Sequence, residues 1–486
     1  MLFNSYIFVF VFFPICLIGY YGLLKSGKPE TARVFLTVMS LWFYGYFNLS
    51  YLLIMICSIA GNYLFHRLLS GESLRLRCDG GKRAVTILAV ALNLGVLFYF
   101  KYFDFFFDSV NAVFGTDFVL RGILLPLGIS FFTFQQISFI VDTYRGEVAD
   151  CSLSEYALFV SFFPQLIAGP IVNHGEMLPQ FRSLGKKRAD WEQIAGGVAL
   201  FVLGLAKKVL LADTFGAGVD YGYENLAALG RADACLVILF YALQLYFDFS
   251  GYCDMAVGIG RMLGVEIPVN FNSPYKAVNI VDFWKRWHIT LNRFFTKYVY
   301  IPLGGNRTAR WRHCLNLLLT FLVSGFWHGS SLTYILWGGI HGLLQILETF
   351  LYPKKRKGLE IKRRRHWWQL PITFVLLCFT WIFFRANSIQ DALWIISRLF
   401  WDIERPMNYL QTGITCLGIS PIAAMGMGLS VLFLALYDLA SLKCDVIAAF
   451  SRQKFFIRWP VYVLLLVVIA LFSPKGVATE FIYFQF

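Results

Sequence analysis

Apolar segments long enough to cross a membrane follow one another along the chain, separated by short polar loops. A helix needs roughly 20 apolar residues to cross a hydrocarbon core about 30 Å thick. The segments lie near residues 3–24, 34–47, 51–66, 85–103, 122–141, 155–170, 194–213, 232–250, 315–352, 370–386, 421–440 and 458–473. Some are short or interrupted by Gly and Pro, which favours re-entrant helices. We therefore expect an all-α polytopic membrane protein with about eleven spanning helices.

The charges of the first loops predict the side of the membrane that each loop occupies. Lys25, Lys28 and Arg33 belong to the first loop, the second loop is neutral, and the third is basic again. Cytoplasmic loops carry an excess of Lys and Arg, so this alternation places the N-terminus outside. The strongest basic stretch, residues 354–365, is expected to be a cytoplasmic orientation and lipid anchor. The first segment lacks the basic leader and cleavage site of a signal peptide, so we expect it to remain as a helix.

The composition indicates a single integral membrane domain over residues 1–486. Hydrophobic residues make up 58% of the chain and charged residues 15%, against about 25% charged in soluble domains. The net charge of +14 comes from basic residues in short loops, which indicates membrane orientation and no nucleic-acid partner. Ten scattered cysteines without a C-x-x-C pair argue against a disulfide framework or a zinc module, and no metal site is expected.

Between Asn270 and His313 the hydropathy falls, yet the composition is not that of a loop. Aromatic residues alternate there with Lys and Arg, which is typical of helices that lie at a membrane interface. We expect this element to face the cytoplasm. Its basic side chains would attract a negatively charged substrate, and they include Lys285, Arg286, Arg293 and Arg307.

His328 is an ionisable side chain placed well inside an apolar segment. No Lys, Arg, Asp or Glu occurs between His313 and Glu348. Thirteen helical residues separate His328 from Leu315, which predicts a depth of roughly 20 Å. Ionisable groups at such depth are costly and indicate function. A neutral imidazole can act as a general base toward a hydroxyl, whereas the alternative is a core histidine bonded to a neighbouring helix.

The segment that holds His328 is too long for one straight helix within a membrane. Residues 315–352 would measure more than about 50 Å as a helix, so the segment must tilt, protrude or break. Two glycine-containing positions are expected as break points, Ser324 with Gly325 and residues 329–331.

Other histidines are weaker candidates. His288 follows an aromatic and basic stretch of the interfacial element and could position a carbonyl or share a proton, or have no chemical role. His341 lies in an apolar segment, where packing is the simpler interpretation. His66, His313 and His366 stand beside arginines and are interpreted as interfacial.

Polar residues inside other apolar segments require partners or water. The segment around residue 250 contains Gln244, Asp248, Ser250, Asp254 and Arg261, which predicts mutual pairing, such as an Asp–Arg pair, or a polar cavity. Residues 127–142 likewise contain several polar side chains and predict helix-to-helix hydrogen bonding or a tunnel lining. Nucleophile elbows, Walker A loops, dinucleotide-binding loops and H-E-x-x-H motifs do not occur in the sequence.

Several ordered motifs resemble the bacterial branch of the membrane-bound O-acyltransferases and are most similar to its alginate O-acetyltransferase group. These motifs extend over most of the chain, from residue 127 to the end. They are SFFTFQQISFIVDTYRG, FFPQLIAGPIVNH, YFDFSGYCDMAVGIGRMLG, NFNSPY, DFWKRWHITLNRFF, YIPLGGNR, SGFWHG and FIYFQF.

The resemblance implies a multi-helix fold with a central tunnel and acyl transfer across the inner membrane. The histidine of the W-H-G motif, His328, would be catalytic, and His288 of the R-W-H motif would be its partner. The resemblance also implies a cytoplasmic acyl donor, with acetyl-CoA expected and no bound cofactor, an extracytoplasmic partner acyltransferase and a glycan acceptor. Candidate substrate-binding residues in or beside the motifs are Trp327, Trp284, Arg286, Asp248 and Gln244.

Three other functions remain as alternatives. D-alanyl transfer to teichoic acid from a carrier protein would use the same fold. A transporter or flippase would use His328 and Asp248 as a proton relay. A passive scaffold for an export complex would dispense with both histidines. The leading prediction is an O-acetyltransferase of an exopolysaccharide or a cell-wall glycan.

Overall fold

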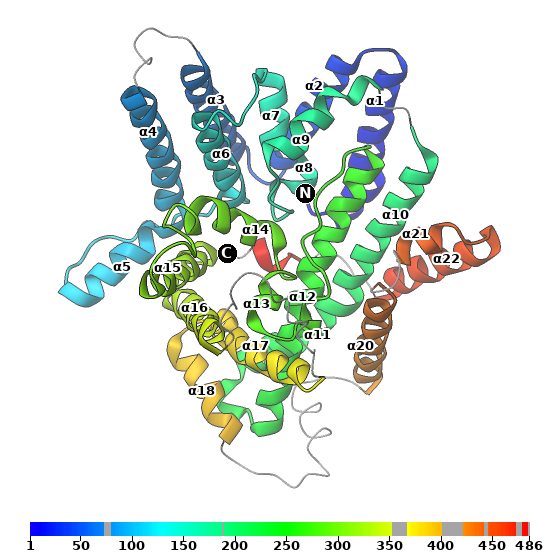
Figure 1. The fold of residues 1–486 in the computed structure, drawn as a ribbon. Helices are drawn as coiled ribbons and strands as arrows, with labels where there is room; N and C mark the ends of the chain where they lie inside the picture. Colours follow the sequence, from blue (N-terminus) through cyan, green and yellow to red (C-terminus); the bar gives the residue numbers. More distant parts are fainter. Residues whose placement is uncertain are drawn as a thin grey trace, which may run out of the picture. The chain divides into compact units, whose positions relative to one another are not determined.

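The computed structural model describes residues 1–71, 79–186, 189–351, 367–400, 421–441, 446–472 and 479–484, and these residues form helices and no strands (Figure 1). Five helices in this part of the chain are long and apolar enough to cross a membrane: Phe8–Lys25, Leu49–Ser70, Gly80–Phe114, Trp191–Glu224 and Arg231–Met262. The all-α membrane architecture is confirmed, whereas the number of about eleven spanning helices is not. The basic stretch 354–365 and His366 lie outside the described residues.

Two of the predicted spanning segments form shorter helices than the hydropathy suggests. In segment 155–170, α7 (Leu153–Ser161) ends before Pro164, which lacks the N–H that would continue the helix. In segment 122–141, α6 (Ile129–Tyr144) begins only after Gly128, whose φ of +71° is outside the helical region. Local backbone chemistry overrides the apolar pattern in both segments.

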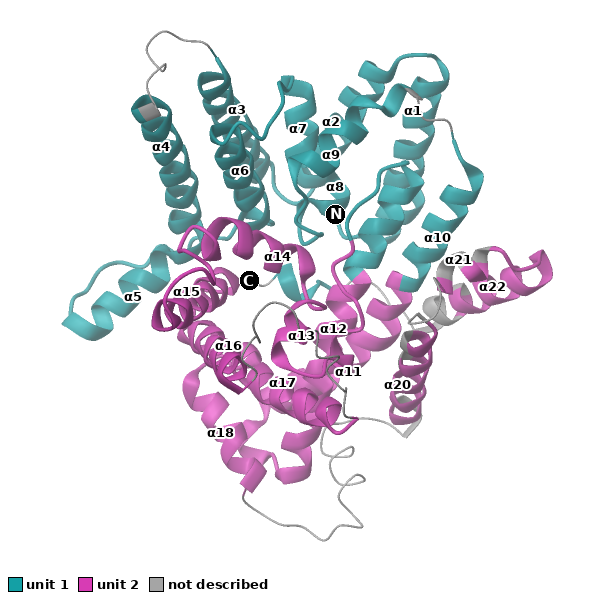
Figure 2. Cartoon of the chain, viewed as in Figure 1, with its two compact units in different colours: residues 1–203, 252–268, 475–485 teal, residues 204–251, 269–474, 486 magenta. Residues whose placement is uncertain are grey.

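The chain divides into two compact units (Figure 2). Unit 1 comprises residues 1–203, 252–268 and 475–485. Its helices are η1 (Phe8–Phe12), α1 (Phe13–Lys25), α2 (Pro29–Gly45), α3 (Leu49–Ser70), α4 (Asp79–Leu97), η3 (Phe98–Tyr102), α5 (Phe103–Phe114), α6, α7, α8 (Phe163–Leu166), α9 (His174–Arg182), η4 (Leu184–Lys186), most of α10 (Trp191–Ala206), the end of α12 (Arg231–Met262) and η10 (Ile482–Phe484).

Side-chain amides and hydroxyls join the helices of unit 1. Asn62 of α3 and Asn93 of α4 exchange two amide hydrogen bonds, of 3.1 and 2.7 Å. Gln136 of α6 donates to Ser58 Oγ and accepts from the hydroxyl of Tyr156. The predicted helix-to-helix hydrogen bonding of residues 127–142 is therefore confirmed at Gln136, and such bonds hold helices together where apolar packing alone does not select a partner.

Two features named in the sequence analysis lie in unit 1. His66 is fully buried and hydrogen-bonded to Thr143 Oγ1 at 3.1 Å, so it packs inside unit 1. The end of the chain, which carries part of the FIYFQF motif, packs into the same unit, because the ring of Phe481 lies 5.0 Å from that of Tyr252.

Unit 2 comprises residues 204–251, 269–474 and 486, and it contains every candidate site residue. Its elements after the end of α10 are η5 (Lys207–Ala212), α11 (Asp213–Glu224), η6 (Leu226–Ala228), most of α12, η7 (Pro274–Lys276), α13 (Ile280–Trp284), α14 (Ile289–Phe295), η8 (Thr296–Tyr300), α15 (Arg310–His328), α16 (Leu332–Leu351), α17 (Gln369–Arg385), α18 (Ile389–Phe400), α20 (Pro421–Ser441), α21 (Val446–Ser451) and α22 (Phe455–Phe472).

Helices α15 and α16 form an antiparallel hairpin that depends on two glycines. A Cβ atom at Gly338 would lie 2.3 Å from the carbonyl oxygen of Phe321 and 3.1 Å from the Cα of Gly325. A Cβ atom at Gly325 would lie 2.3 Å from the carbonyl oxygen of Tyr334. Small residues allow helix backbones in membranes to approach this closely. The pair Gly325 and Gly338 therefore sets the separation of α15 and α16 immediately before the turn of the hairpin.

We expect Gly338→Ala to destabilise the protein by about 1–3 kcal/mol, because the added methyl group overlaps the backbone of α15. Gly339→Ala is the matched control. Its Cβ would meet only Leu322 Cδ2 at an ordinary 3.5 Å, and alanine favours a helix over glycine by about 1 kcal/mol. Thermal unfolding of both variants in the same detergent checks this prediction. An unfolding midpoint of Gly338→Ala at or above that of Gly339→Ala would contradict it.

Candidate functional site

His328 is the last residue of α15 and lies at the turn of the hairpin. The chain breaks at residues 329–331, one of the two expected positions, and continues as α16, whereas Ser324 and Gly325 remain helical. Gly329 is needed at this turn, because a Cβ atom there would lie 2.2 Å from the ring of Tyr334. The helix end and the turn thus deliver the imidazole to one defined place.

Aromatic rings surround the imidazole of His328. Its centroid lies 4.9 Å from the ring of Trp327, 5.1 Å from that of Trp337 and 5.2 Å from that of Phe384, all in edge-to-face arrangements. Only 3% of His328 is exposed. Water is largely excluded from this position, a condition that protects reactive acyl groups from hydrolysis.

His288 adopts an uncommon backbone conformation between two short helices. It follows α13 and caps α14 with φ +44° and ψ +52°, in the left-handed region that residues other than glycine rarely occupy. Holding a residue there costs about 1–3 kcal/mol, and such positions cluster at functional sites. The side chain is fully buried.

Asn270 determines which ring nitrogen of His288 carries the proton. The backbone N–H of Thr290 donates to Asn270 Oδ1 at 3.1 Å. An N–H group can only donate, so the atom at this position must be the amide oxygen. His288 Nδ1 lies 3.2 Å from the same oxygen and must therefore carry a hydrogen. The neutral ring consequently presents Nε2 as its acceptor atom, which is the arrangement that a general base requires.

Burial keeps His288 uncharged. Loss of hydration lowers the pKa of the imidazole from 6.5 to about 3. The ring also packs edge-on against Phe249, with centroids 4.7 Å apart. An imidazole in this environment accepts a proton only transiently, because the charged form is poorly solvated.

Trp327 lies between the two histidines. Its ring centroid is 6.3 Å from that of His288 and 4.9 Å from that of His328. The structure therefore brings His288, Trp327 and His328 together, although the two histidines are forty residues apart in the sequence.

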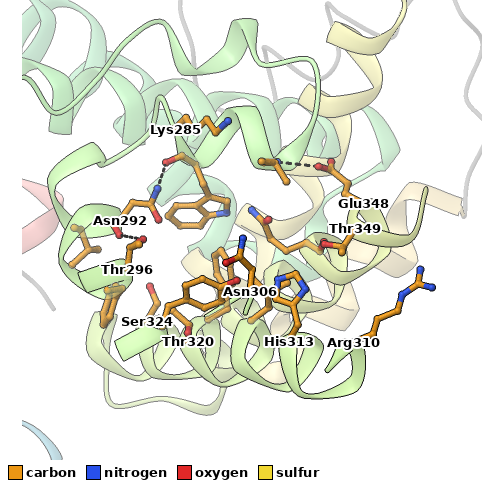
Figure 3. A pocket seen from close by; sticks show the side chains of 18 residues that line it. Lys285, Asn292, Thr296, Asn306, Arg310, His313, Thr320, Ser324, Glu348 and Thr349 are labelled. Carbon is orange, nitrogen blue, oxygen red and sulfur yellow. Dashed lines mark hydrogen bonds between the residues drawn. The ribbon is translucent and has the colours of Figure 1, made fainter. Parts of the chain in front are cut away.

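A cavity of about 880 Å³ is lined in part by α15 (Figure 3). The α15 residues that line the cavity recur at intervals of three or four positions, so they lie on one face of the helix. The residues of that face are Arg310, His313, Leu317, Thr320, Phe321 and Ser324. The face extends for about 21 Å, and Trp327 and His328 follow Ser324 at the same spacing. The last α15 residue that lines the cavity, Ser324, thus lies one helical turn before His328.

The cavity lining combines charged and aromatic side chains. Lys285 and Arg310 are exposed and supply positive charge, and His313 also lines the cavity. Glu348 is another lining residue, and its carboxylate accepts the N–H groups of Ile280 and Val281 at 2.6 and 3.1 Å. The aromatic walls include Trp284 and Phe321. Such a mixed lining suits a ligand with an anionic head and a less polar arm.

Two candidate substrate-binding residues, Trp284 at the end of α13 and Arg286 in the turn that follows, have different neighbours. Trp284 forms part of the cavity wall, and Asn292 donates to its carbonyl oxygen at 2.7 Å. Arg286 lies 3.1 Å from Asp282 and donates to the carbonyl oxygen of Asn272. Of the four basic residues expected to attract a substrate, Lys285 lines the cavity, and Arg286, Arg293 and Arg307 are not among its lining residues.

Asp248 belongs to a buried ion cluster in another part of unit 2. Lys208 Nζ lies 2.9 Å from Asp248 Oδ1 and 2.8 Å from Asp213 Oδ1. Asp248 therefore has a charged partner, but this partner is a lysine of η5 and lies outside the segment for which mutual pairing, such as an Asp–Arg pair, was predicted. Gln244, one turn earlier on α12, packs against Gly216 of α11. Neither Asp248 nor Gln244 lines the cavity.

Sequence reasoning missed three residues that shape the site, and a fourth, Lys208, that pairs with Asp248 elsewhere in unit 2. Lys208 carried a usable signal, because a lysine inside an apolar segment requires a partner. Arg310 and His313 lie on the face of α15 that continues to His328, and their helical spacing was another signal. Asn270 could not be linked to His288, because that contact depends on how the chain folds between them.

A model of the family described as "MBOAT, membrane-bound O-acyltransferase family" matches residues 124–390, which include both histidines and the cavity. The chain is 41% identical to a peptidoglycan O-acetyltransferase of Helicobacter pylori over 423 residues, covering 82% of this chain and 79% of that protein. It is 37% identical to a probable alginate O-acetylase of Pseudomonas aeruginosa, covering 88% and 82%. It is 29% identical to a teichoic acid D-alanyltransferase of Bacillus subtilis, covering 54% and 69%.

We expect Asn270→Asp to raise the pKa of His288, because a carboxylate that accepts the Nδ1–H stabilises the imidazolium. The wild-type ring should stay neutral from about pH 8 down to about pH 5, since its pKa is about 3. The variant ring should gain a proton as the pH falls within that range. Nitrogen-15 spectra of histidine-labelled protein measure this, with His288→Gln identifying the signal. Identical titrations of wild type and variant would contradict the assigned tautomer and its partner.

We expect Lys208→Met to be more destabilising than Asp248→Asn. Removing the lysine leaves two neighbouring carboxylates without their cation, at a cost of about 3–5 kcal/mol. Asp248→Asn leaves Lys208 paired with Asp213. The double variant should recover part of the stability that Lys208→Met loses, because only Asp213 stays charged. Thermal unfolding of the three variants tests this order, and a Lys208→Met protein as stable as wild type would disprove it.

Proposed function

Because this chain belongs to the membrane-bound O-acyltransferase family and is an O-acyltransferase, we propose that it moves an acetyl group from cytoplasmic acetyl-CoA across the inner membrane to modify an extracytoplasmic glycan. His328 and His288 are the catalytic residues in this proposal. The observation that carries it is the single face of α15 that lines the cavity from Arg310 to Ser324 and continues to His328.

The cavity suits acetyl-CoA as the donor. The phosphates of a nucleotide-containing thioester would be attracted to Lys285 and Arg310, which are exposed residues of the cavity lining. The less polar arm that carries the thioester would lie along the aromatic walls, with its acyl end toward Ser324. Trp284, which forms one wall, would contact this arm.

The topology in this proposal follows from charge and length. Basic residues near the start of α15 favour a cytoplasmic location for that end. The nineteen residues of α15 extend for about 28 Å, so the hairpin would enter from the cytoplasm and turn deep in the membrane at His328. A donor from one side and an acceptor from the other would then meet at the tip of the hairpin.

The proposed reaction needs one base and one acid. The acceptor hydroxyl oxygen attacks the thioester carbonyl carbon, the new C–O bond forms, and the C–S bond breaks. An imidazole takes the hydroxyl proton and returns it to the departing thiolate, which leaves as a thiol. His288 suits the role of base, since Asn270 directs Nε2 as its acceptor atom. His328 would orient the acceptor or share the proton.

The acceptor class follows from the relatives. Two of them are named as a peptidoglycan O-acetyltransferase and a probable alginate O-acetylase, which favours a glycan as the acceptor. In our proposal the acetyl group reaches the glycan through an extracytoplasmic partner acyltransferase, and residues 1–486 act as one catalytic domain. D-alanyl transfer to teichoic acid is the second candidate, which the relative in Bacillus subtilis favours.

We expect His328→Ala to abolish the acyl esters that the wild-type chain restores to a null strain. Base-released acyl groups from purified envelope and secreted glycans would be identified by mass spectrometry at matched membrane abundance. Ser330→Ala is the matched control, because Ser330 is exposed at the same turn and does not line the cavity. We expect acetate from wild type and Ser330→Ala, and a loss of at least about 100-fold in His328→Ala, because a reacting group that is no longer oriented, or that cannot share its proton, loses a factor of this order.

Two outcomes would change the proposed function. Release of D-alanine in place of acetate would assign the protein to the second candidate. Full restoration of the esters by His328→Ala would remove His328 from the chemistry and favour transport or a scaffold role.

A further inference from the structure

We propose that His341 is a positioning residue that holds two indoles of the site, Trp284 in the cavity wall and Trp337 against His328. This inference rests on the proposed function, in which the cavity receives the acyl donor. His341 lies on α16 and is fully buried. Its ring contacts both indoles, with centroids 5.2 Å from Trp284 and 4.9 Å from Trp337.

A chain of three hydrogen bonds passes through His341. Trp284 Nε1 donates to His341 Nδ1 at 3.2 Å. His341 Nε2 lies 3.1 Å from Thr380 Oγ1, and that hydroxyl donates to the carbonyl oxygen of Leu377 at 2.8 Å. These three hydrogen bonds connect α13, α16 and α17 within unit 2.

The hydrogen bonds to Trp284 and to Thr380 require the same tautomer of His341. An indole nitrogen can only donate, so Nδ1 must accept. The hydroxyl hydrogen of Thr380 is committed to Leu377, so its oxygen accepts a hydrogen from Nε2. The ring therefore carries its proton on Nε2, and both of its nitrogens are used. His341 is thus suited to holding neighbours and not to transferring protons.

The orientation of Trp284 depends on this acceptor. Its indole packs against Phe321 and Trp337, with centroid separations of 5.2 and 5.8 Å. These apolar contacts tolerate several ring orientations, whereas only one directs Nε1 at His341. An indole N–H that loses its buried partner costs about 1–3 kcal/mol and would turn toward another acceptor. The wall of the cavity would change shape as a result.

His341 also supports His328, through Trp337. Trp337 lies between the two imidazoles, since its ring centroid is 4.9 Å from His341 and 5.1 Å from His328. Trp337 also stacks on Trp381 at 5.8 Å. His341 therefore connects the cavity wall to the ring that confines His328, although it contacts neither the cavity nor His328 itself.

Two substitutions separate the two hydrogen bonds of His341. In His341→Asn the side-chain oxygen takes the place of Nδ1 and can accept from Trp284. In His341→Gln the amide nitrogen takes the place of Nε2 and can donate to Thr380. Trp284→Phe removes the donor while keeping an aromatic ring. The full-length protein in lipid nanodiscs would be titrated with acetyl-CoA, and the unfolding midpoint of each variant would be recorded.

We expect His341→Gln and Trp284→Phe each to weaken acetyl-CoA binding by about tenfold. His341→Asn should rescue most of the wild-type affinity. The double variant His341→Gln with Trp284→Phe should bind no more weakly than either single variant, because both remove the same hydrogen bond. Equal weakening by His341→Asn and His341→Gln, in proportion to their loss of stability, would show a packing role alone and overturn the proposal. Unchanged binding in every variant would overturn it as well.

A second measurement separates failure of this inference from failure of the proposed donor. The indole N–H signal of Trp284, identified by its loss in Trp284→Phe, reports the hydrogen bond without any ligand. It should move in His341→Gln and stay in place in His341→Asn. A wild-type protein that does not bind acetyl-CoA would refute the donor, and an indole signal unaffected by His341→Gln would refute the positioning role.

Discussion

Polar groups inside a membrane protein must find their partners within the protein, because the hydrocarbon core offers no water. Much of the described structure follows from this constraint. Lys208 joins two aspartates, Asn62 and Asn93 bond to each other, and His341 uses both of its ring nitrogens. Each partner lies on a different element, so satisfying the polar groups also fixes which helices pack together.

The same constraint distinguishes the histidines of unit 2 from one another. Asn270 requires a hydrogen on Nδ1 of His288, whereas Trp284 requires a bare Nδ1 on His341. The two rings therefore adopt opposite tautomers. His288 presents Nε2 as an acceptor toward its surroundings, and His341 has both nitrogens engaged in structural hydrogen bonds. Burial and aromatic contacts are similar for both, so the hydrogen-bonding neighbours decide which ring is suited to chemistry.

The sequence predicted features that depend on the length and the composition of one segment. The break after His328 was expected, because residues 315–352 are too long for a single helix in a membrane and glycine occurs at the turn. Features that depend on distant segments could not be predicted. Asp248 gave no indication that Lys208, forty residues away, is its partner. Hydropathy measures how apolar a segment is, but not which polar group it meets, and it overlooked the effect of Pro164 on α7.

The close approach of α15 and α16 connects stability with the chemistry of the site. Gly325 and Gly338 bring the two backbones together one turn before His328, so Trp337, the residue that precedes Gly338, is carried into contact with that imidazole. A wider separation would withdraw Trp337 and admit water beside His328. The glycines therefore do more than pack two helices. They set the distance at which one helix presents the histidine and the other closes the aromatic enclosure around it, and His341, one turn further along α16, connects that enclosure to the wall of the cavity.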